Sequence, residues 1–454
     1  MRQAAARSAV LVRACEVQSR VVSAPPAPGL FDPATETLDR HSLRNQQLRR
    51  VQELFDEILP RNAFYARKFG SQREVPSWDA FFELPFTTKH ELADDQALNP
   101  PYGTNLTYPI ARYVKLHQTS GTTGKAPIRW LDTEESWDWW AHCWGHVYTG
   151  AGVGRGDRVF FAFSFGPFIG FWAAYEGTRR VGAMAIPGGG MQTDQRLHSM
   201  LDDEVTVLCC TPTYALRMAE EAERLGIDLP ASPIHATVHA GEPGASVPGV
   251  RARIERAFGA RCHDHTGMTE LGATGFTCRE QSGVHLIESE FIFEVVDPQT
   301  LQAVPDGEHG ELVATNLGRA GMPLIRYRTG DLVQIDASAC RCGRTFARLS
   351  GGILGRTDDM VVVRGVNIFP SAIEGVLREF PEVSEFRIEV FSRRSMAELK
   401  VLVDPRPGAE AGLADRVAER LNDRLLLRVP CELVPAGSLP RFELKARRLV
   451  RRDM

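Results

Sequence analysis

The sequence predicts an α/β protein in which a large N-terminal domain, with doubly wound sheets and a β subdomain, precedes a small C-terminal α+β domain. Through the middle of the chain, apolar strand-like runs alternate with amphipathic helical stretches. This alternation is typical of parallel sheets covered on both faces. From about residue 286 short strand-like runs follow one another, which favours antiparallel pairing. A chain of 454 residues with 43% hydrophobic composition is long enough for two or three domains.

Residues 1–36 are predicted to be a disordered leader. The segment is rich in Ala and Arg and has no acidic residue before Glu16, and the stretch "SAPPAPG" (23–29) cannot continue a helix. Its composition also resembles an organelle transit peptide, and an upstream start codon is a third explanation. The next segment, 38–69, has apolar residues at helical spacing and is expected to be helical.

The large domain is expected to span residues 37–357, with its strand-and-helix core in the middle. The segment "DRVFFAFSF" (157–165) is interpreted as a strand, which the following Gly-Pro pair ends. The segments "VTVLCCTP" (205–212) and "HATVHAGEP" (235–243) are interpreted as two more buried strands. Each strand is followed by a turn and an amphipathic helix, so a doubly wound sheet is predicted.

Glycine-rich turns follow two of these strands, at 186–191 ("IPGGGM") and 239–244 ("HAGEPG"). Ligands bind beyond the carboxyl ends of strands in sheets of this kind, so these turns are candidate site segments. A β subdomain is expected at about 275–350, and the small domain at 358–454. The elements predicted for the small domain are helices at 372–380 and 412–425 and strands at 385–391 and 397–404.

The charge and cysteine content narrow the class of protein. The formal net charge is −4, with 24% charged residues, which gives no general reason to expect nucleic acid or a membrane surface as partner. No apolar stretch approaches the roughly 18 residues of a membrane span. Nine cysteines follow no regular framework, and their odd number excludes complete internal pairing. A reduced, cytoplasmic protein is therefore predicted.

The stretch "TSGTTGK" (119–125) combines glycines, hydroxyl groups and a lysine. Backbone N–H groups of a glycine-rich turn can converge on an anion, and the lysine adds positive charge, so a phosphate-binding loop is predicted. The loop is not of the Walker A type. Only two residues separate Gly121 from Gly124, and Ala126 follows the lysine. A polar surface turn is the alternative interpretation.

Four further segments carry charged residues at turns. They are "HDHTGMTE" (263–270), "IRYRTGDL" (325–332), "LGRTDDMVVVRGVNIFPSAIE" (354–374) and "PRFELKARR" (440–448). Each alone is more typical of a solvated turn than of a site. In this order and together with "TSGTTGK", they resemble the motifs of the adenylate-forming superfamily, and most closely those of phenylacetate–CoA ligases and related aryl–CoA ligases. The resemblance covers roughly residues 40–454.

The resemblance implies a role for each matching position. The phosphate-binding residues would be Ser120, Gly121, Thr122, Thr123, Gly124 and Lys125. The segment lining adenine would be Gly241, Glu242 and Pro243. The catalytic group would be Thr269 at the α-phosphate, Glu270 as ligand of Mg²⁺, and Lys445 bridging the carboxylate and the α-phosphate. The ribose would bind Asp331, assisted by Arg356, and the hinge between the domains would be Asp358.

The resemblance also implies the reaction and its partners. A carboxylic acid attacks ATP to give acyl-AMP and pyrophosphate, and CoA then displaces AMP to give a thioester. The small domain rotates between the two steps, which makes it mobile. A carrier-protein thiol is left open as the acceptor in place of CoA, a nucleotide-binding regulatory protein without catalysis is the alternative from another class, and a homodimer is left open.

Two positions depart from the motifs of the family. Relatives have an aromatic residue, usually Tyr, where this chain has Thr266, so the stacking on adenine is weaker or another ring supplies it. Relatives usually have Gly directly before the final lysine, where this chain has Leu444. That change could alter the reach of the loop without removing the lysine.

Three cysteines and one histidine form a candidate zinc set. Cys278, His285, Cys340 and Cys342 would supply three thiolates and an imidazole, a tetrahedral and structural combination. The CxC spacing is less typical than CxxC, although some phenylacetate–CoA ligase relatives have cysteine and histidine at matching positions. Buried, reduced thiols are the alternative.

The acyl pocket is expected near the aromatic segment 161–175 and the turn 186–191. Aromatic side chains beside space made by glycines suit a flat aryl acid. The pocket residues selected are Phe165, Phe168, Gly188 and Gly189. The alternative is that most of these rings belong to the core.

Overall fold

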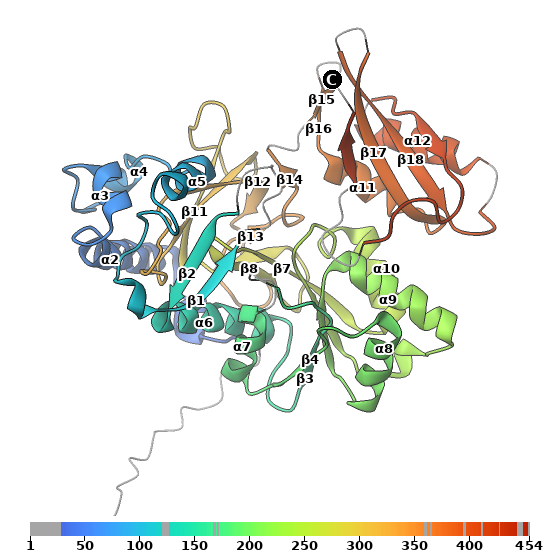
Figure 1. Ribbon diagram of the computed structural model, residues 1–454, viewed down its shortest axis with the longest axis horizontal. Coiled ribbons are helices and arrows are strands. Elements are labelled where there is room, and N and C mark those ends of the chain that lie inside the picture. Colours follow the sequence, from blue (N-terminus) through green and yellow to red (C-terminus); the bar gives the residue numbers. More distant parts are fainter. Residues whose placement is uncertain are drawn as a thin grey trace, which may run out of the picture.

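The computed structural model describes most of the chain outside its first 28 residues. The described ranges are 29–119, 127–166, 169, 172–357, 361–363, 366–393, 396–409, 412–425, 427–442 and 448–452. Two lobes are visible in Figure 1, with the C-terminal lobe (orange to red) set above α9 and α10 of the larger one. None of the described helices combines the length and the apolar composition that crossing a lipid bilayer requires.

The N-terminal part of the large domain is helical. Its helices are α1 (Pro33–Glu36), α2 (Arg40–Ile58), α3 (Ala63–Phe69), α4 (Trp78–Phe82), α5 (Lys89–Leu98) and the short η1 (Ile110–Arg112). The helix predicted over 38–69 is thus interrupted. Pro60 stands in the gap, and the Asn62 side chain accepts a hydrogen bond from the Tyr65 N–H and begins α3.

The predicted boundary of the leader is wrong at its end. Residues 33–36 form α1, and Glu36 is fully buried, where its carboxylate pairs with Arg344 and lies 3.2 Å from Nδ1 of His146. A buried carboxylate needs such partners, so these residues belong to the fold of the large domain. The prediction for residues 1–28 lies outside the described residues.

The parallel part of the main sheet has the strand order β4-β3-β5-β6-β7. These strands are β3 (Arg158–Phe161), β4 (Met184–Pro187), β5 (Val207–Cys210), β6 (Ala236–His239) and β7 (Arg261–Met268). Helices α6 (Glu134–Gly150) and α7 (Trp172–Val181) pack on one face; α8 (Thr193–Asp202), α9 (Pro212–Leu225) and α10 (Pro248–Phe258), with η2 (Leu229–Ala231), cover the other. Alternate residues of β3 confirm this, because Phe161 packs with α6 and Phe160 with α8 and α9. The strand predicted to reach residue 165 ends at Phe161, and residues 162–166 continue as a loop.

The sheet continues into an antiparallel part without a break. From β7 the order is β8-β9-β13-β12-β11-β10, and β14 pairs with β12. These strands are β8 (Gly272–Thr277), β9 (Val284–Leu286), β10 (Phe291–Val296), β11 (His309–Asn316), β12 (Tyr327–Asp336), β13 (Arg348–Leu349) and β14 (Gly355–Arg356). A separate hairpin pairs β1 (Tyr113–Gln118) with β2 (Arg129–Thr133).

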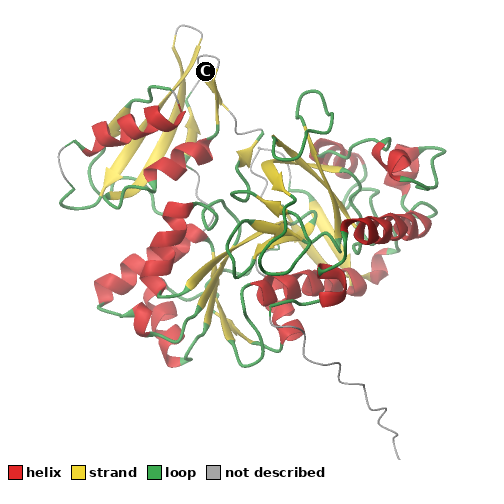
Figure 2. Cartoon of the chain, turned by 180° about the vertical axis from the view of Figure 1, so that it is seen from behind, coloured by secondary structure: helices red, strands yellow, loops and turns green. Residues whose placement is uncertain are grey.

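The C-terminal domain has its own sheet and its own core. The sheet order is β19-β18-β17-β20, and β15 and β16 form a hairpin beside it. The elements are β15 (Val361–Val363), β16 (Val366–Ile368), α11 (Pro370–Leu377), β17 (Val383–Arg393), β18 (Met396–Pro405), α12 (Leu413–Leu425), β19 (Cys431–Leu433) and β20 (Leu449–Arg451). Both helices lie on the same face of the sheet (Figure 2), and their apolar side chains form one cluster with it. The predicted mixed α/β fold with a separate small domain is confirmed.

Candidate functional site

Strand β12 and the short β14 bring Asp331 and Arg356 together. These two residues are register partners in the sheet, and Nη1 of Arg356 lies 3.0 Å from Oδ1 of Asp331. Gly330, with φ of +73°, precedes the aspartate, and a Cβ built there would lie 2.7 Å from the Arg356 guanidinium. This position within β12 therefore favours glycine because of its left-handed backbone conformation, and a side chain there would also displace the arginine. The predicted ribose-binding pair lies together.

Glu270 lies in the middle of the turn between β7 and β8, close to β12. Its Oε1 accepts a hydrogen bond of 3.0 Å from the Tyr327 hydroxyl and lies 3.6 Å from Nζ of Lys89 on α5. Burial, together with the negative charge of Glu270, raises the pKa of Tyr327 well above its ordinary value. The tyrosine thus remains a donor and fixes the carboxylate. Tyr327 is four residues before Asp331 in β12, so one strand positions both predicted site carboxylates.

The turn that carries Thr269 and Glu270 is anchored by a buried arginine. Nη1 of Arg319 donates to the backbone carbonyls of both residues, at 2.8 Å each. The same guanidinium makes two bonds of 2.7 Å to the Asp132 carboxylate, and both side chains are fully buried. Because Asp132 belongs to β2, this pair ties the β1–β2 hairpin to the turn.

Lys89, Asp132 and Arg319 were missed by the sequence reasoning. Each is a single charged residue outside the motifs, and the chain positions of Asp132 and Arg319 differ by 187. Only the fold brings them to the site.

The segment predicted to line adenine follows β6. Gly241 has φ of +95°, a left-handed conformation that glycine adopts without strain. The next residue, Glu242, reaches across to α9, where its Oε1 accepts a hydrogen bond of 2.9 Å from the Thr213 N–H. The carboxylate thus satisfies a backbone donor in the first turn of that helix.

Several predicted residues lie outside the described residues. They are Ser120, Gly121, Thr122, Thr123, Gly124, Lys125, Phe168, Asp358 and Lys445. The structure describes only the surroundings of the predicted phosphate loop, which connects β1 to β2. The Asp132–Arg319 pair ties this hairpin to the turn that carries Thr269. The roles of the nine residues remain predictions.

The predicted acyl-pocket residues divide into two kinds. Gly189 is exposed, and a Cβ built there would lie 3.2 Å from the Phe165 ring, so these two residues adjoin. Gly188 is buried, and a Cβ there would lie 2.5 Å from the ring of Phe160, a core residue. Gly188 therefore makes room for the core. Phe165 is partly buried and lies 4.5 Å from Trp172 between ring centroids.

The four predicted zinc ligands converge. Each residue offers one ligand atom, and these four atoms all lie within 4.8 Å of one another. They are the Sγ atoms of Cys278, Cys340 and Cys342 and an imidazole nitrogen of His285. They come from the end of β8, from β9 and from the loop before β13, three segments that the antiparallel sheet places side by side.

The geometry of this cluster suits a tetrahedral ion. The Sγ atoms of Cys278 and Cys340 are 3.8 Å apart, which equals the separation of about 3.8 Å expected for two thiolates on zinc at about 2.3 Å each. Nε2 of His285 lies 3.4 Å from Sγ of Cys342, while its Nδ1 lies 3.1 Å from the Phe346 carbonyl. A hydrogen bond to that carbonyl places the ring proton on Nδ1 and leaves Nε2 for a metal. A hydrogen bond from Cys278 lowers the pKa of Cys342 below its ordinary value, which favours a thiolate.

Comparison with known proteins gives matches over nearly the whole chain. Residues 365–452 match the family described as "AMP-binding enzyme C-terminal domain". The phenylacetate–coenzyme A ligase of Thermus thermophilus is 32% identical over 441 residues, which are 91% of this chain and 97% of the relative.

Solved structures of a 2-hydroxyisobutyryl-CoA ligase are also similar. In its postadenylation state with R3-HIB-AMP, that enzyme superposes with a TM-score of 0.89 at 30% identity, covering 94% of each chain. In its thioesterification state with 2-HIB-AMP and CoA, the TM-score is 0.72 at 31% identity over 94% of each chain. The arrangement of this chain therefore matches the postadenylation state more closely.

Proposed function

The chain belongs to the phenylacetate–coenzyme A ligase family of AMP-forming acid–CoA ligases, and we propose that its own substrate is an aromatic acid of the phenylacetate or benzoate type. Enzymes of this class use ATP to form an acyl-AMP and then transfer the acyl group to CoA. The observation that most supports an aryl substrate is the 32% identity to a phenylacetate–CoA ligase over 91% of the chain. The partly buried Phe165 beside the open Gly189 is consistent with a flat ring at that edge.

The described residues suggest how the large domain serves acid activation. A carboxylate attacking a polyphosphate must overcome charge repulsion, so the site has to neutralise charge and align the reactants. Asp331, held by Arg356, would accept hydrogen bonds from the ribose hydroxyls. Glu270, fixed by Tyr327, is a carboxylate of the kind that Mg²⁺ prefers, and the ion would reduce the charge on the phosphates. Lys89 would add a positive charge beside it.

Lys445 would complete the adenylation site from the C-terminal domain. Replacing it by Ala is expected to abolish acyl-AMP formation while thioester formation from supplied acyl-AMP continues. Lys400→Ala, in β18 of the same domain, is the matched control. Equal loss of both half-reactions in the Lys445 variant would contradict the role.

We also propose that Cys278, His285, Cys340 and Cys342 hold a structural zinc ion. The donor set and its distances fit zinc, and four protein ligands leave no open position for catalysis. The ion would link β8, β9 and the loop before β13.

The eight described cysteines are free of disulfide bonds, which supports a proposed location in the reducing cytoplasm.

The function is tested by measuring pyrophosphate release with ATP and Mg²⁺ over a panel of acids, with and without CoA. The panel includes aryl acids and short aliphatic 2-hydroxy acids, because the similar solved structures are of a 2-hydroxyisobutyryl-CoA ligase. Release that one aryl acid supports and CoA sustains is the expected result. Preference for a 2-hydroxy acid would overturn the aryl assignment. Release that CoA does not stimulate would point to a carrier-protein thiol, and ATP binding without turnover on any acid would point to a regulatory protein. A homodimer stays a prediction that gel filtration tests.

A further inference from the structure

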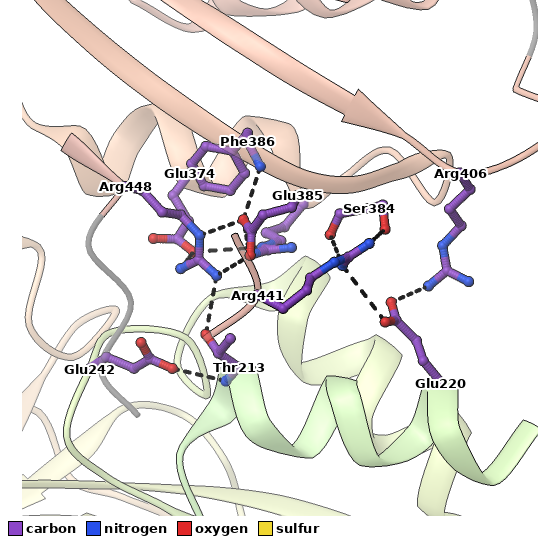
Figure 3. Close-up of polar contacts among 11 residues, drawn as sticks. Thr213, Glu220, Glu242, Glu374, Ser384, Glu385, Phe386, Arg406, Arg441 and Arg448 are labelled. Atoms are coloured by element: carbon purple, nitrogen blue, oxygen red, sulfur yellow. Dashed lines mark hydrogen bonds and ion pairs between the residues drawn. The ribbon is translucent and has the colours of Figure 1, made fainter. Parts of the chain in front are cut away.

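Helix α9 of the large domain faces the C-terminal domain through Thr213 and Glu220 (Figure 3). These residues are seven positions apart, two turns of helix, and so lie on the same face. Thr213 contacts Arg448, and Glu220 contacts Arg406 and Arg441. Every one of these arginines belongs to the C-terminal domain, so α9 carries a polar contact between the two domains.

Arg448 is held in place by its own domain. Its Nε and Nη2 donate to the two carboxylate oxygens of Glu385 on β17, at 2.7 and 3.1 Å. Its Nη1 lies 3.0 Å from Glu374 on α11. Only 7% of the side chain is exposed. Two carboxylates thus fix a buried guanidinium before any contact with the large domain is counted.

The same guanidinium reaches the nucleotide-binding segment of the other domain. Nη2 of Arg448 donates to Oγ1 of Thr213 at 3.3 Å, and the Thr213 N–H donates to Glu242. Figure 3 shows Thr213 with Arg448 above it and Glu242 to its left. A continuous line of polar contacts therefore runs from the C-terminal domain to the segment that is predicted to line adenine.

We propose that Arg448 is a positioning residue, which docks the C-terminal domain on the first turn of α9 for acyl-AMP formation. The inference rests on the proposed function and gives Arg448, the last residue of the segment 440–448, a role that the resemblance does not assign to it. Arg448 comes three residues after Lys445 in the sequence, the residue that is predicted to act in acyl-AMP formation. The higher TM-score with the postadenylation relative than with its thioesterification state supports assigning the described arrangement to the part of the cycle before CoA reacts.

The second contact reinforces the docking without making it permanent. Glu220 lies 3.0 Å from Arg406 and 3.8 Å from Arg441, and the three side chains are 32–39% exposed. Water and salt ions readily replace partners in such a partly exposed contact, so this pair allows the domain to leave after the first half-reaction.

The test uses Thr213, because it leaves the carboxylate cage of Arg448 intact. Thr213→Val keeps the shape and the backbone N–H to Glu242 but removes the hydroxyl acceptor, and Thr213→Ser retains it. Acyl-AMP formation is measured by isotope exchange between pyrophosphate and ATP, with an acid that the wild type accepts. Thioester formation is measured separately, from supplied acyl-AMP and CoA.

Thr213→Val is expected to lower kcat of acyl-AMP formation about 10-fold, as loss of a hydrogen bond to a charged group does. The KM for ATP should change little, thioester formation should remain within about 2-fold of wild type, and Thr213→Ser should restore the exchange rate. Equal slowing of both half-reactions would show a merely structural role and overturn the proposal. Unchanged exchange in Thr213→Val would overturn it as well.

Arg448→Lys provides a second measurement. Lysine keeps one charge near Glu374 and Glu385 but cannot make the fork of bonds that also reaches Thr213. Circular dichroism checks that the variant is folded. Pyrophosphate–ATP exchange should then be slower than in the wild type, while the rate of thioester formation stays the same. If neither rate falls, the inference is contradicted. A wild-type protein without exchange on any acid would instead refute the proposed function, so the two failures are distinguishable.

Discussion

The buried ion pair that supports the site in the large domain differs in kind from the ion pairs between the domains. Asp132 and Arg319 are fully buried and joined by two bonds of 2.7 Å. Glu220 and its two arginines are about one-third exposed, at 3.0 and 3.8 Å. The Asp132–Arg319 pair holds the turn that carries Glu270. The Glu220 contacts hold the C-terminal domain, which is expected to rotate between the two half-reactions.

The difference is the one that the proposed rotation of the C-terminal domain would require. Breaking a buried pair leaves an uncompensated charge, which costs about 3–5 kcal/mol. An exposed pair contributes about 0–1 kcal/mol, because water replaces the partner. An exposed pair therefore suits a contact that has to break in every catalytic cycle. A buried pair suits a contact that keeps the shape of the site.

The largest expected effect is on the buried pair. Asp132→Asn leaves Arg319 buried without its counter-charge and should lower the free energy of unfolding by about 3–5 kcal/mol. Urea denaturation measures this change. Asp138→Asn is the control, since Asp138 pairs with Arg180 while 61% exposed. A loss no larger than the control's would remove the distinction between the two kinds of pair.

Zinc would be a second permanent tie in the large domain. Cys342→Ser removes one of the four proposed ligands. Zinc affinity should fall by more than the roughly 10- to 100-fold that is typical when a residue hydrogen-bonded to a ligand is lost. Elemental analysis of purified protein should find about one zinc per chain in the wild type and much less in the variant. Cys431→Ser, in β19 of the other domain, should retain the metal. Wild-type protein without zinc would refute the site.

Asp264 tests what a buried charge costs when Arg251 and hydrogen bonds compensate it only in part. Burial, opposed by a hydrogen bond from Ser246, raises the pKa of Asp264 to about 6. The folded protein thus binds the proton more tightly than the unfolded chain does, so this stabilising contribution is complete below about pH 4 and is lost as the pH rises through about 6.

Asp264→Asn should therefore be more stable than wild type at pH 8, by about 2 kcal/mol, with the advantage vanishing near pH 4. Denaturation at both pH values measures it. The exposed Asp202→Asn should change stability equally at both. An advantage of Asp264→Asn that is the same at pH 4 and pH 8 would show that its charge is not the cause.

The smallest expected effect is at the exposed contact of Glu220 with Arg406 and Arg441. Glu220→Gln should change the rate of acyl-AMP formation about 2- to 3-fold and the stability by less than about 1 kcal/mol, more so at low salt. Glu382→Gln, which weakens the 2.8 Å pair with Arg416 inside the C-terminal domain, is the matched control and should leave the rate unchanged. A tenfold or larger effect of Glu220→Gln would place this pair with the permanent ones.

Local patterns predicted most elements but not their exact ends. Period-3.6 spacing continues across Pro60, so the break between α2 and α3 depends on a capping bond that spacing does not report. Phe163 and Phe165 continue the alternation of β3, yet among the described strands neither β4 nor β5 pairs with them. The end of the leader was misplaced because the partners that bury Glu36 lie as far along the chain as Arg344.

The sequence by itself determined the family, the order of the domains and the residues that meet at Asp331–Arg356 and at the Cys₃His cluster. Motifs carry that information because turn glycines and charged side chains occupy fixed positions relative to strand ends. Only the tertiary structure decided which isolated charges join them. Lys89, Arg319 and Arg448 find their carboxylates on distant elements, and a long-range ion pair leaves no pattern in the neighbouring sequence.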